Sequence, residues 1–204
     1  MGGKLKIFKY AGAGLLFLSL LPLFSCARPT GIGIGGRYLD GKMELIRRSH
    51  GDLNKAVDLL ESVVMEDPLY KDSLMLLARA YYKKGRYGGA MQVAQRSLSI
   101  NPKDEIAWII LGLIQLRLGD NDNGLESLKG GLTLLSQVSK PGYRDVEAWD
   151  PKGSVRNALS RTVFITLKGV SYRDDIIRSA EQLLATIDHE EWMGAADQAL
   201  DRRT

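Results

Sequence analysis

A repeat spacing of 34 residues governs the middle of this chain. Glycines recur at that interval at Gly51, Gly85 and Gly119. Asp67-Pro68 and Asn101-Pro102 stand the same distance apart. A fixed period of this length is typical of stacked helical hairpins, because each unit buries its apolar face only against its neighbours. The sequence therefore predicts an all-α solenoid.

The unit from residue 71 to 104 shows how each hairpin is specified. One apolar stripe with helical spacing covers residues 74–81, and a second covers residues 90–98. Gly85 lies between them, where glycine takes the left-handed conformation that ends a helix. Asn101-Pro102 ends the second helix, because a residue before proline avoids the α region. Each unit is thus expected to be a pair of helices.

This unit resembles a tetratricopeptide repeat. Ala78, Tyr81, Ala90 and Pro102 match the small residue, the tyrosine, the alanine and the closing proline that are typical of that family. The preceding and following units keep part of the pattern, which places about three repeats within residues 37–136. The resemblance implies that the first helices of successive repeats line a concave face.

By register with that family, the concave face forms a predicted partner or ligand groove. The helix expected over residues 105–118 is apolar almost all round, which indicates burial on more than one side. Two interpretations stay open: the groove holds an apolar or amphipathic partner segment, or the chain's own C-terminal helices fill it. The predicted groove residues are Met75, Arg79, Tyr82, Lys83, Ile106, Ile109, Leu113 and Leu116.

The C-terminal region, residues 137–204, is expected to form a helical cap over the last repeat. Apolar residues with helical spacing predict one helix over residues 155–170 and a second over residues 176–187. A third helix is predicted to start at Asp188, because Glu191 follows three residues later as in a capping box.

Residues 1–25 have the build of a secretory signal peptide. Three lysines precede an uncharged apolar run that is too short to be a permanent membrane anchor. The run ends in Leu23-Phe24-Ser25-Cys26, which resembles the lipobox of bacterial lipoproteins and implies a lipid such as palmitate on Cys26. Residues 26–36 contain Cys26 and four glycines, and are predicted to form a flexible tether.

The residue after the cysteine bears on location. Ala27 stands where enterobacterial lipoproteins retained at the inner membrane have aspartate. The resemblance therefore implies a lipid-anchored protein of the bacterial outer membrane that faces the periplasm. Cys26 is the only cysteine, so no disulfide forms within the chain. No cofactor is expected apart from the covalent lipid.

The charge balance argues against nucleic-acid binding. The formal net charge is +4. Lys4, Lys6 and Lys9 all belong to the predicted signal peptide, and without them 25 basic residues face 24 acidic ones. A nearly neutral chain lacks the positive charge that binds phosphates.

No motif for catalysis or metal binding stands out. His50 and His189 lie far apart in the sequence, and neither belongs to a known metal-binding motif. The turn at Asp120 invites a calcium interpretation, but an EF-hand starting there would need ligands where Gly124 and Gly131 stand. We expect neither an enzyme nor a metal site.

Two functions remain. The first is a membrane-anchored interaction scaffold that assists the assembly of a secretion, pilus or outer-membrane complex, with an envelope protein or peptide segment as partner. Small tetratricopeptide lipoproteins that act as pilotins resemble the chain in this respect. The alternative is an accessory lipoprotein of a transport system that holds a solute or apolar ligand. A scaffold would expose Arg79 and Tyr82, whereas a ligand site would enclose Ile109 and Leu113.

Overall fold

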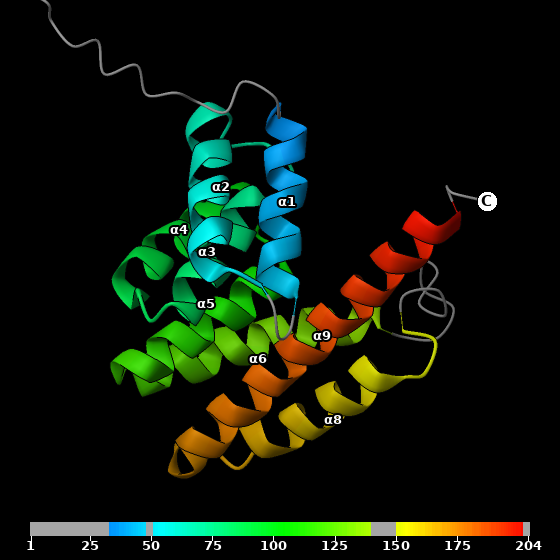
Figure 1. Ribbon diagram of the computed structural model, residues 1–204. Helices are drawn as coiled ribbons and strands as arrows, with labels where there is room; N and C mark the ends of the chain where they lie inside the picture. Colours follow the sequence, from blue (N-terminus) through cyan, green and yellow to red (C-terminus); the bar gives the residue numbers. More distant parts are fainter. Residues whose placement is uncertain (1–32, 48–50, 140–149, 202–204) are drawn as a thin grey trace, which may run out of the picture. The chain divides into compact units, whose positions relative to one another are not determined.

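The computed structural model describes residues 33–47, 51–139 and 150–201, and every regular element in these ranges is a helix (Figure 1). The predicted signal peptide and Cys26 lie outside the described residues, as do His50 and most of the predicted tether. The prediction of an all-α fold is confirmed.

Six helices form three consecutive hairpins. In each hairpin the two helices pack on each other, and each hairpin also packs on the next. The first helices of neighbouring hairpins contact one another as well, so they line a common face. This arrangement confirms the predicted solenoid. The helices are α1 (Ile34–Ile46), α2 (Leu53–Glu66), α3 (Ser73–Lys83), α4 (Tyr87–Ile100), α5 (Glu105–Leu118) and α6 (Asn121–Val138).

Glycines form the predicted turns inside two of the hairpins. Gly85 has a φ of +73° and Gly119 a φ of +87°, so both are left-handed. The amide of Gly119 donates to the carbonyl of Leu116 and closes the last turn of α5. The 34-residue spacing of these glycines therefore reflects a backbone conformation that other residues adopt only with strain.

The third hairpin is packed by close approach of its backbones. A Cβ atom on Gly112 of α5 would lie 2.7 Å from the amide nitrogen of Leu128 in α6. A Cβ atom on Gly131 of α6 would lie 2.8 Å from the carbonyl oxygen of Glu105. Glycine at these two positions lets α5 and α6 meet without intervening side chains.

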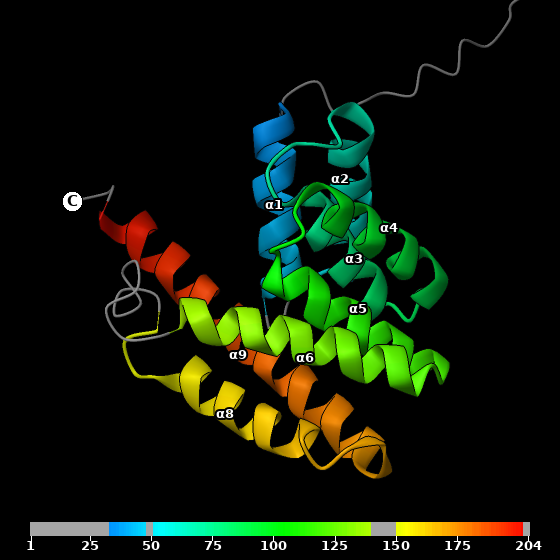
Figure 2. The same cartoon turned by 180° about the vertical axis from the view of Figure 1, so that it is seen from behind.

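Beyond the repeats, α8 (Ser154–Thr166) and α9 (Arg173–Asp201) form a further helical pair, joined through a short 3₁₀ helix, η1 (Val170–Tyr172). Asp150, which precedes α8, stabilises the start of this helix by accepting hydrogen bonds from the amides of Val155 and Arg156. Figure 2 shows α8 beside α6 on the side of the repeats that lies opposite to α2, and α6 and α8 are in contact.

Two expectations about this region are wrong. The helices predicted over residues 176–187 and from Asp188 are one continuous helix, α9. Asp188 is buried in the middle of α9, where its carboxylate contacts cations of the repeats instead of capping a helix start. The helix predicted over residues 155–170 ends at Thr166, and Val170 lies in η1 with an exposed side chain.

The predicted tether also ends earlier than expected. Gly33 is the residue before α1, and Ile34, Gly35 and Gly36 are helical. The α1 helix extends into the glycine-rich segment because Ile34 packs against the core of the repeats. The helices of the hairpins thus run from Ile34 to Val138, slightly beyond the expected limits of residues 37–136.

Candidate functional site

Helix α9 lies across the first helices of the repeats. We use the term first-helix face for the side of α1, α3 and α5 that contacts α9. Figure 1 shows α9 passing the C-terminal end of α1, and both α1 and α5 contact it. Side chains of α3 bond to it directly. The face predicted to be a groove is therefore occupied by the chain's own helix.

A buried charge cluster forms the centre of this contact. Arg79 of α3 is 1% exposed, and its guanidinium pairs with the carboxylate of Asp188 in α9. The same guanidinium donates a hydrogen bond of 2.9 Å to the carbonyl of Leu184. Lys83 lies one turn further along α3, and its Nζ is 2.9 Å from the other carboxylate oxygen of Asp188. One acidic side chain of α9 thus neutralises two cations of α3.

A second acidic side chain of α9 bridges α3 and α5. The Tyr82 hydroxyl donates to the carboxylate of Glu181. Arg117 of α5 places its Nη2 at 2.7 Å from the same carboxylate oxygen. The side chains of Arg117 and Glu181 are about one-third exposed, at 38% and 35%. Water therefore screens this pair more than the Arg79–Asp188 pair.

The first helix α1 adds a third point of contact. Its Lys42 lies 3.5 Å from the carboxylate of Glu191. Just beyond the end of α1, the guanidinium of Arg47 lies 5.0 Å from the ring centre of Trp192, within the range of a cation–π interaction. All three repeats therefore supply cations toward α9.

Burial changes the acid–base properties of this face. Burial lowers the pKa of the Lys83 ammonium, and the charge of Asp188 opposes that effect. Burial also raises the pKa of the Tyr82 phenol, so the hydroxyl keeps its proton and donates to Glu181. The hydrogen bond to Glu181 is the main cause of the raised pKa of Arg117.

The structure brings the predicted groove residues together but does not leave them open. Met75, Arg79 and Tyr82 are buried, and so are the apolar residues of α5 predicted for the groove, Ile109, Leu113 and Leu116. Ile106 is half-buried against the core. Lys83 is partly covered, with 32% of its side chain exposed. Of the two interpretations of the groove, filling by a C-terminal helix is the one that the structure shows.

A cleft remains beside α9 on the first-helix face. Its volume is about 380 Å³. The residues around it are mostly polar and charged, and neither Ile109 nor Leu113 is among them. The cleft therefore differs from the enclosed apolar cavity that the ligand-binding alternative requires. It is lined by Arg79, Tyr82, Lys83, Tyr87, Arg117, Glu181, Leu184, Ala185 and Asp188.

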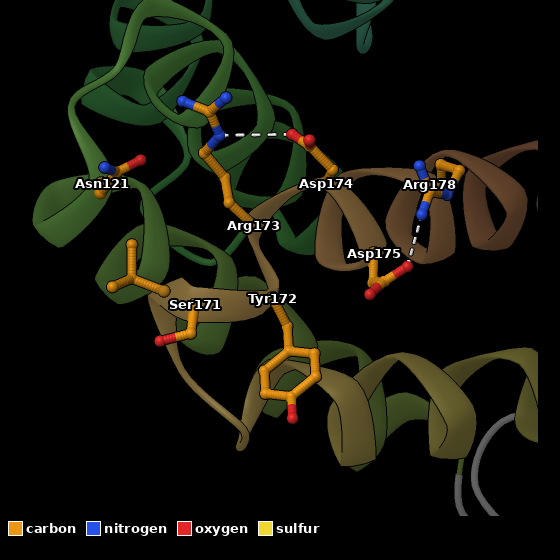
Figure 3. A pocket seen from close by; sticks show the side chains of 8 residues that line it. Asn121, Ser171, Tyr172, Arg173, Asp174, Asp175 and Arg178 are labelled. Carbon is orange, nitrogen blue, oxygen red and sulfur yellow. Dashed lines mark hydrogen bonds and ion pairs between the residues drawn. The ribbon is translucent and has the colours of Figure 1, made fainter.

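A wider cleft lies at the start of α9, and none of the predicted groove residues lines it. Its volume is about 560 Å³, and it is bordered by η1 and by Asn121 of α6. Figure 3 shows that its charged side chains pair with each other: Arg173 lies 3.4 Å from Asp174, and Arg178 pairs with Asp175. These local pairs leave no charge in the cleft unmatched.

The sequence-based predictions of site residues do not include two acidic residues of α9 that pair with the repeats, Glu181 and Asp188. Glu181 was not singled out, and Asp188 was assigned to a helix start. The available signal was the spacing of the two acids, which stand seven residues apart in a stretch with no glycine or proline between them. Two turns of a helix place such residues on one face. That spacing could have identified an acidic stripe in a continuous helix.

In the part of the chain that the structure describes, no three histidine, cysteine or acidic side chains are grouped so that they could hold a metal ion. Among the same residues, no helix combines the length and the apolar character needed to cross a membrane.

Comparison with known proteins agrees with the hairpin geometry. A family model described as a tetratricopeptide repeat matches residues 48–130. No curated protein matches the chain significantly. The chain therefore contains tetratricopeptide repeats, within a region that runs from before α2 into α6. Repeats of this kind commonly form scaffolds for protein–protein interactions.

Proposed function

We propose that this protein is a membrane-anchored interaction scaffold that assists the assembly of a bacterial envelope complex. Lipid on Cys26 would hold it in the outer membrane, facing the periplasm, and it would carry out no catalysis itself. The support for the anchor is the sequence pattern alone, in which a basic and then apolar leader ends in Leu23-Phe24-Ser25-Cys26. Several acyl chains would anchor the protein firmly, whereas one chain alone binds only marginally.

The observation that carries the scaffold proposal is the first-helix face itself. It already holds a helix, α9, through residues from all three hairpins. This is the helix-in-groove mode by which helical arrays recognise protein segments. Arg79 and Tyr82 are buried under α9 and not exposed as expected of a scaffold, so a helical segment of an envelope protein would bind this face in place of α9.

The anchor is tested by substituting its cysteine. Cys26→Ser is expected to leave the precursor unprocessed or to release the protein from membranes, as judged by its size and by detergent partitioning. Unchanged size and partitioning would contradict the lipid anchor.

The partner is tested by photo-crosslinking in intact cells. Arg79 is unsuitable for the probe because its side chain is buried. Leu118 ends α5 directly after Arg117 and is 52% exposed, so a probe there is accessible and next in sequence to a residue that pairs with α9. Met65 is 82% exposed and serves as the control position, because it lies on α2, the second helix of its hairpin. A discrete protein adduct from Leu118, absent from Met65, is expected.

The same experiment separates the two functions. If Leu118 yields no protein adduct and native mass spectrometry of the purified protein reveals a bound small molecule, the transport accessory replaces the scaffold. The polar lining of the cleft beside α9 does not favour that outcome for an apolar ligand.

A further inference from the structure

Three cations of the repeats depend on α9 for their counter-ions. Among the described residues, each ion pair of Arg79, Lys83 and Arg117 is made with an acid of α9. In the described part of the repeats, no acid forms an ion pair with these three side chains. Without α9, the first-helix face would carry uncompensated positive charge along α3 and α5.

The acidic residues that pair with these cations are spaced so that they lie on one side of a helix. Glu181 and Asp188 stand seven residues apart, so both project from one side of α9. Leu184 lies between them, with a buried side chain and a carbonyl that accepts from Arg79. Two acids with a leucine between them make up a compact recognition pattern on one face of a helix.

The fit of α9 to this face is incomplete. The Nε atom of Arg79 is buried and has no hydrogen-bond partner among the residues that the structure describes. The cleft of about 380 Å³ beside α9 is lined by these same cations. A buried donor without a partner is destabilising, because it has lost its hydrogen bonds to water and gained none in return. A partner helix that satisfied this donor would make a hydrogen bond on the face that α9 does not make.

α9 is also held by α8, through contacts that do not involve the repeats. Thr162 of α8 donates to the carbonyl of Ser179 at 3.1 Å, and the two hydroxyls lie 2.9 Å apart. Ser179 lies outside the pattern of Glu181, Leu184 and Asp188. The pairing of α8 with α9 therefore rests on different residues from the contact of α9 with the first-helix face.

We propose that the first-helix face recognises an acidic amphipathic helix of a partner protein, and that α9 occupies the face as an internal substitute for that helix. The partner helix would carry two acidic residues seven positions apart with an apolar residue between them. It would bind by taking the place of α9 on Arg79, Lys83 and Arg117. This inference rests on the proposed scaffold function and names its partner class and its internal competitor.

The test uses the full chain and a fluorescent peptide of residues 174–193, which carries the α9 pattern. Binding is followed by fluorescence anisotropy. The peptide is offered to the wild-type chain and to a Glu181→Gln/Asp188→Asn chain, whose own α9 competes less well. The peptide is expected to bind the substituted chain at least about tenfold more tightly, and affinity should fall as salt rises because charges on the face are screened.

Matched substitutions control for net charge. A peptide with Glu181→Gln and Asp188→Asn should bind at least about tenfold more weakly than the unsubstituted peptide. A peptide with Asp175→Asn and Glu190→Gln loses the same charge, yet should bind as the unsubstituted peptide does, because the ion pairs of α9 with the described first-helix face are made by Glu181, Asp188 and Glu191 instead. Circular dichroism verifies that each chain is folded. If the doubly substituted chain does not fold, Glu181→Gln alone replaces it, since that side chain is partly exposed.

Each outcome decides the inference. Equal affinity of the two chains for the peptide, equal affinity of the substituted and unsubstituted peptides, or no binding at all would overturn it. A protein adduct at Leu118 in cells together with absent peptide binding would overturn the acidic-helix inference and leave the scaffold standing. Peptide binding with no adduct in cells would contradict the scaffold instead.

Discussion

The interface between α5 and α6 differs in kind from the interface between the repeats and α9. The first is apolar and close: glycine at Gly112 and Gly131 brings the two backbones together, and Ile109 and Leu116, which lie against α6, are fully buried. The second adds ion pairs and hydrogen bonds centred on Asp188 to the apolar side chains of α9 that are buried in the core, such as Leu184 and Ile187. Apolar contact joins α5 to α6, whereas both apolar contact and charge hold α9.

This difference has an energetic consequence. Apolar burial is non-directional and strengthens with the area removed from water. A buried ion pair recovers the cost of its own desolvation only when its geometry is good and its remaining donors and acceptors are satisfied. The α9 interface can therefore be weakened by single charge substitutions that leave the helical hairpins intact.

A large effect is expected in the apolar interface. Gly112→Ala should destabilise the protein by about 1–3 kcal/mol, because the new Cβ meets backbone atoms of α6 that cannot move aside. Gly130→Ala, in the same hairpin, is the matched control, since a Cβ atom there meets nothing within 4 Å. It should stabilise by up to about 1 kcal/mol through helix propensity. Denaturant unfolding of both variants measures the difference, and equal effects would contradict the close approach.

A carboxylate in the repeats, Asp104, is expected to make the stability of the protein depend on pH. Asp104 caps α5 by accepting from the amide of Ala107, and burial raises its pKa to about 6. Because its pKa is higher in the folded state than in the unfolded state, the folded state loses stability as pH rises from about 4 to 6. Asp104→Asn keeps the cap and removes that titration.

The measurement for Asp104 is the free energy of unfolding of both proteins between pH 4 and pH 7. Asp104→Asn should gain stability relative to the wild type across this range, on the order of 1 kcal/mol for each pH unit of pKa difference. A stability difference that does not change with pH would contradict the raised pKa.

The smallest effect is expected at the exposed edge of the α9 interface. Glu181→Gln should cost about 0.2–1 kcal/mol, because its pair with Arg117 is partly solvated. Raising the salt concentration should diminish the loss. Asp175→Asn removes a comparably exposed acid that pairs with Arg178 within α9, and it serves as a control. A loss at Glu181 that is insensitive to salt would mean that this pair is more deeply buried than the structure indicates.

The same contrast explains what could be predicted from the sequence. The hairpins were predictable because their signals are local: the turn at Gly85 and the helix end at Asn101-Pro102 can be read within one repeat. The identity of the groove residues was predictable from their register. The sequence does not reveal that a C-terminal helix covers these residues, because that depends on contacts such as the one between Lys83 and Asp188, which lie 105 residues apart.

Asp188 illustrates why the cap was partly misassigned. Aspartate followed three residues later by glutamate has the pattern of a helix start, and local sequence supports that interpretation. In the structure the aspartate is buried against Arg79 and Lys83, and the helix continues through it. Only the tertiary partners distinguish a capping aspartate from a buried one.

The coupling energy between Arg79 and Asp188 tests the account most directly. A double-mutant cycle with Arg79→Met and Asp188→Leu, measured by denaturant unfolding, compares the two single variants with the double variant. Asp188→Leu should cost about 3–5 kcal/mol because the buried charge of Arg79 loses its partner. Arg79→Met should cost less, because Lys83 still pairs with Asp188. The double variant should recover part of that loss, with a coupling energy of about 1–3 kcal/mol. Losses that add within about 0.5 kcal/mol would contradict a charge-held α9 on the first-helix face.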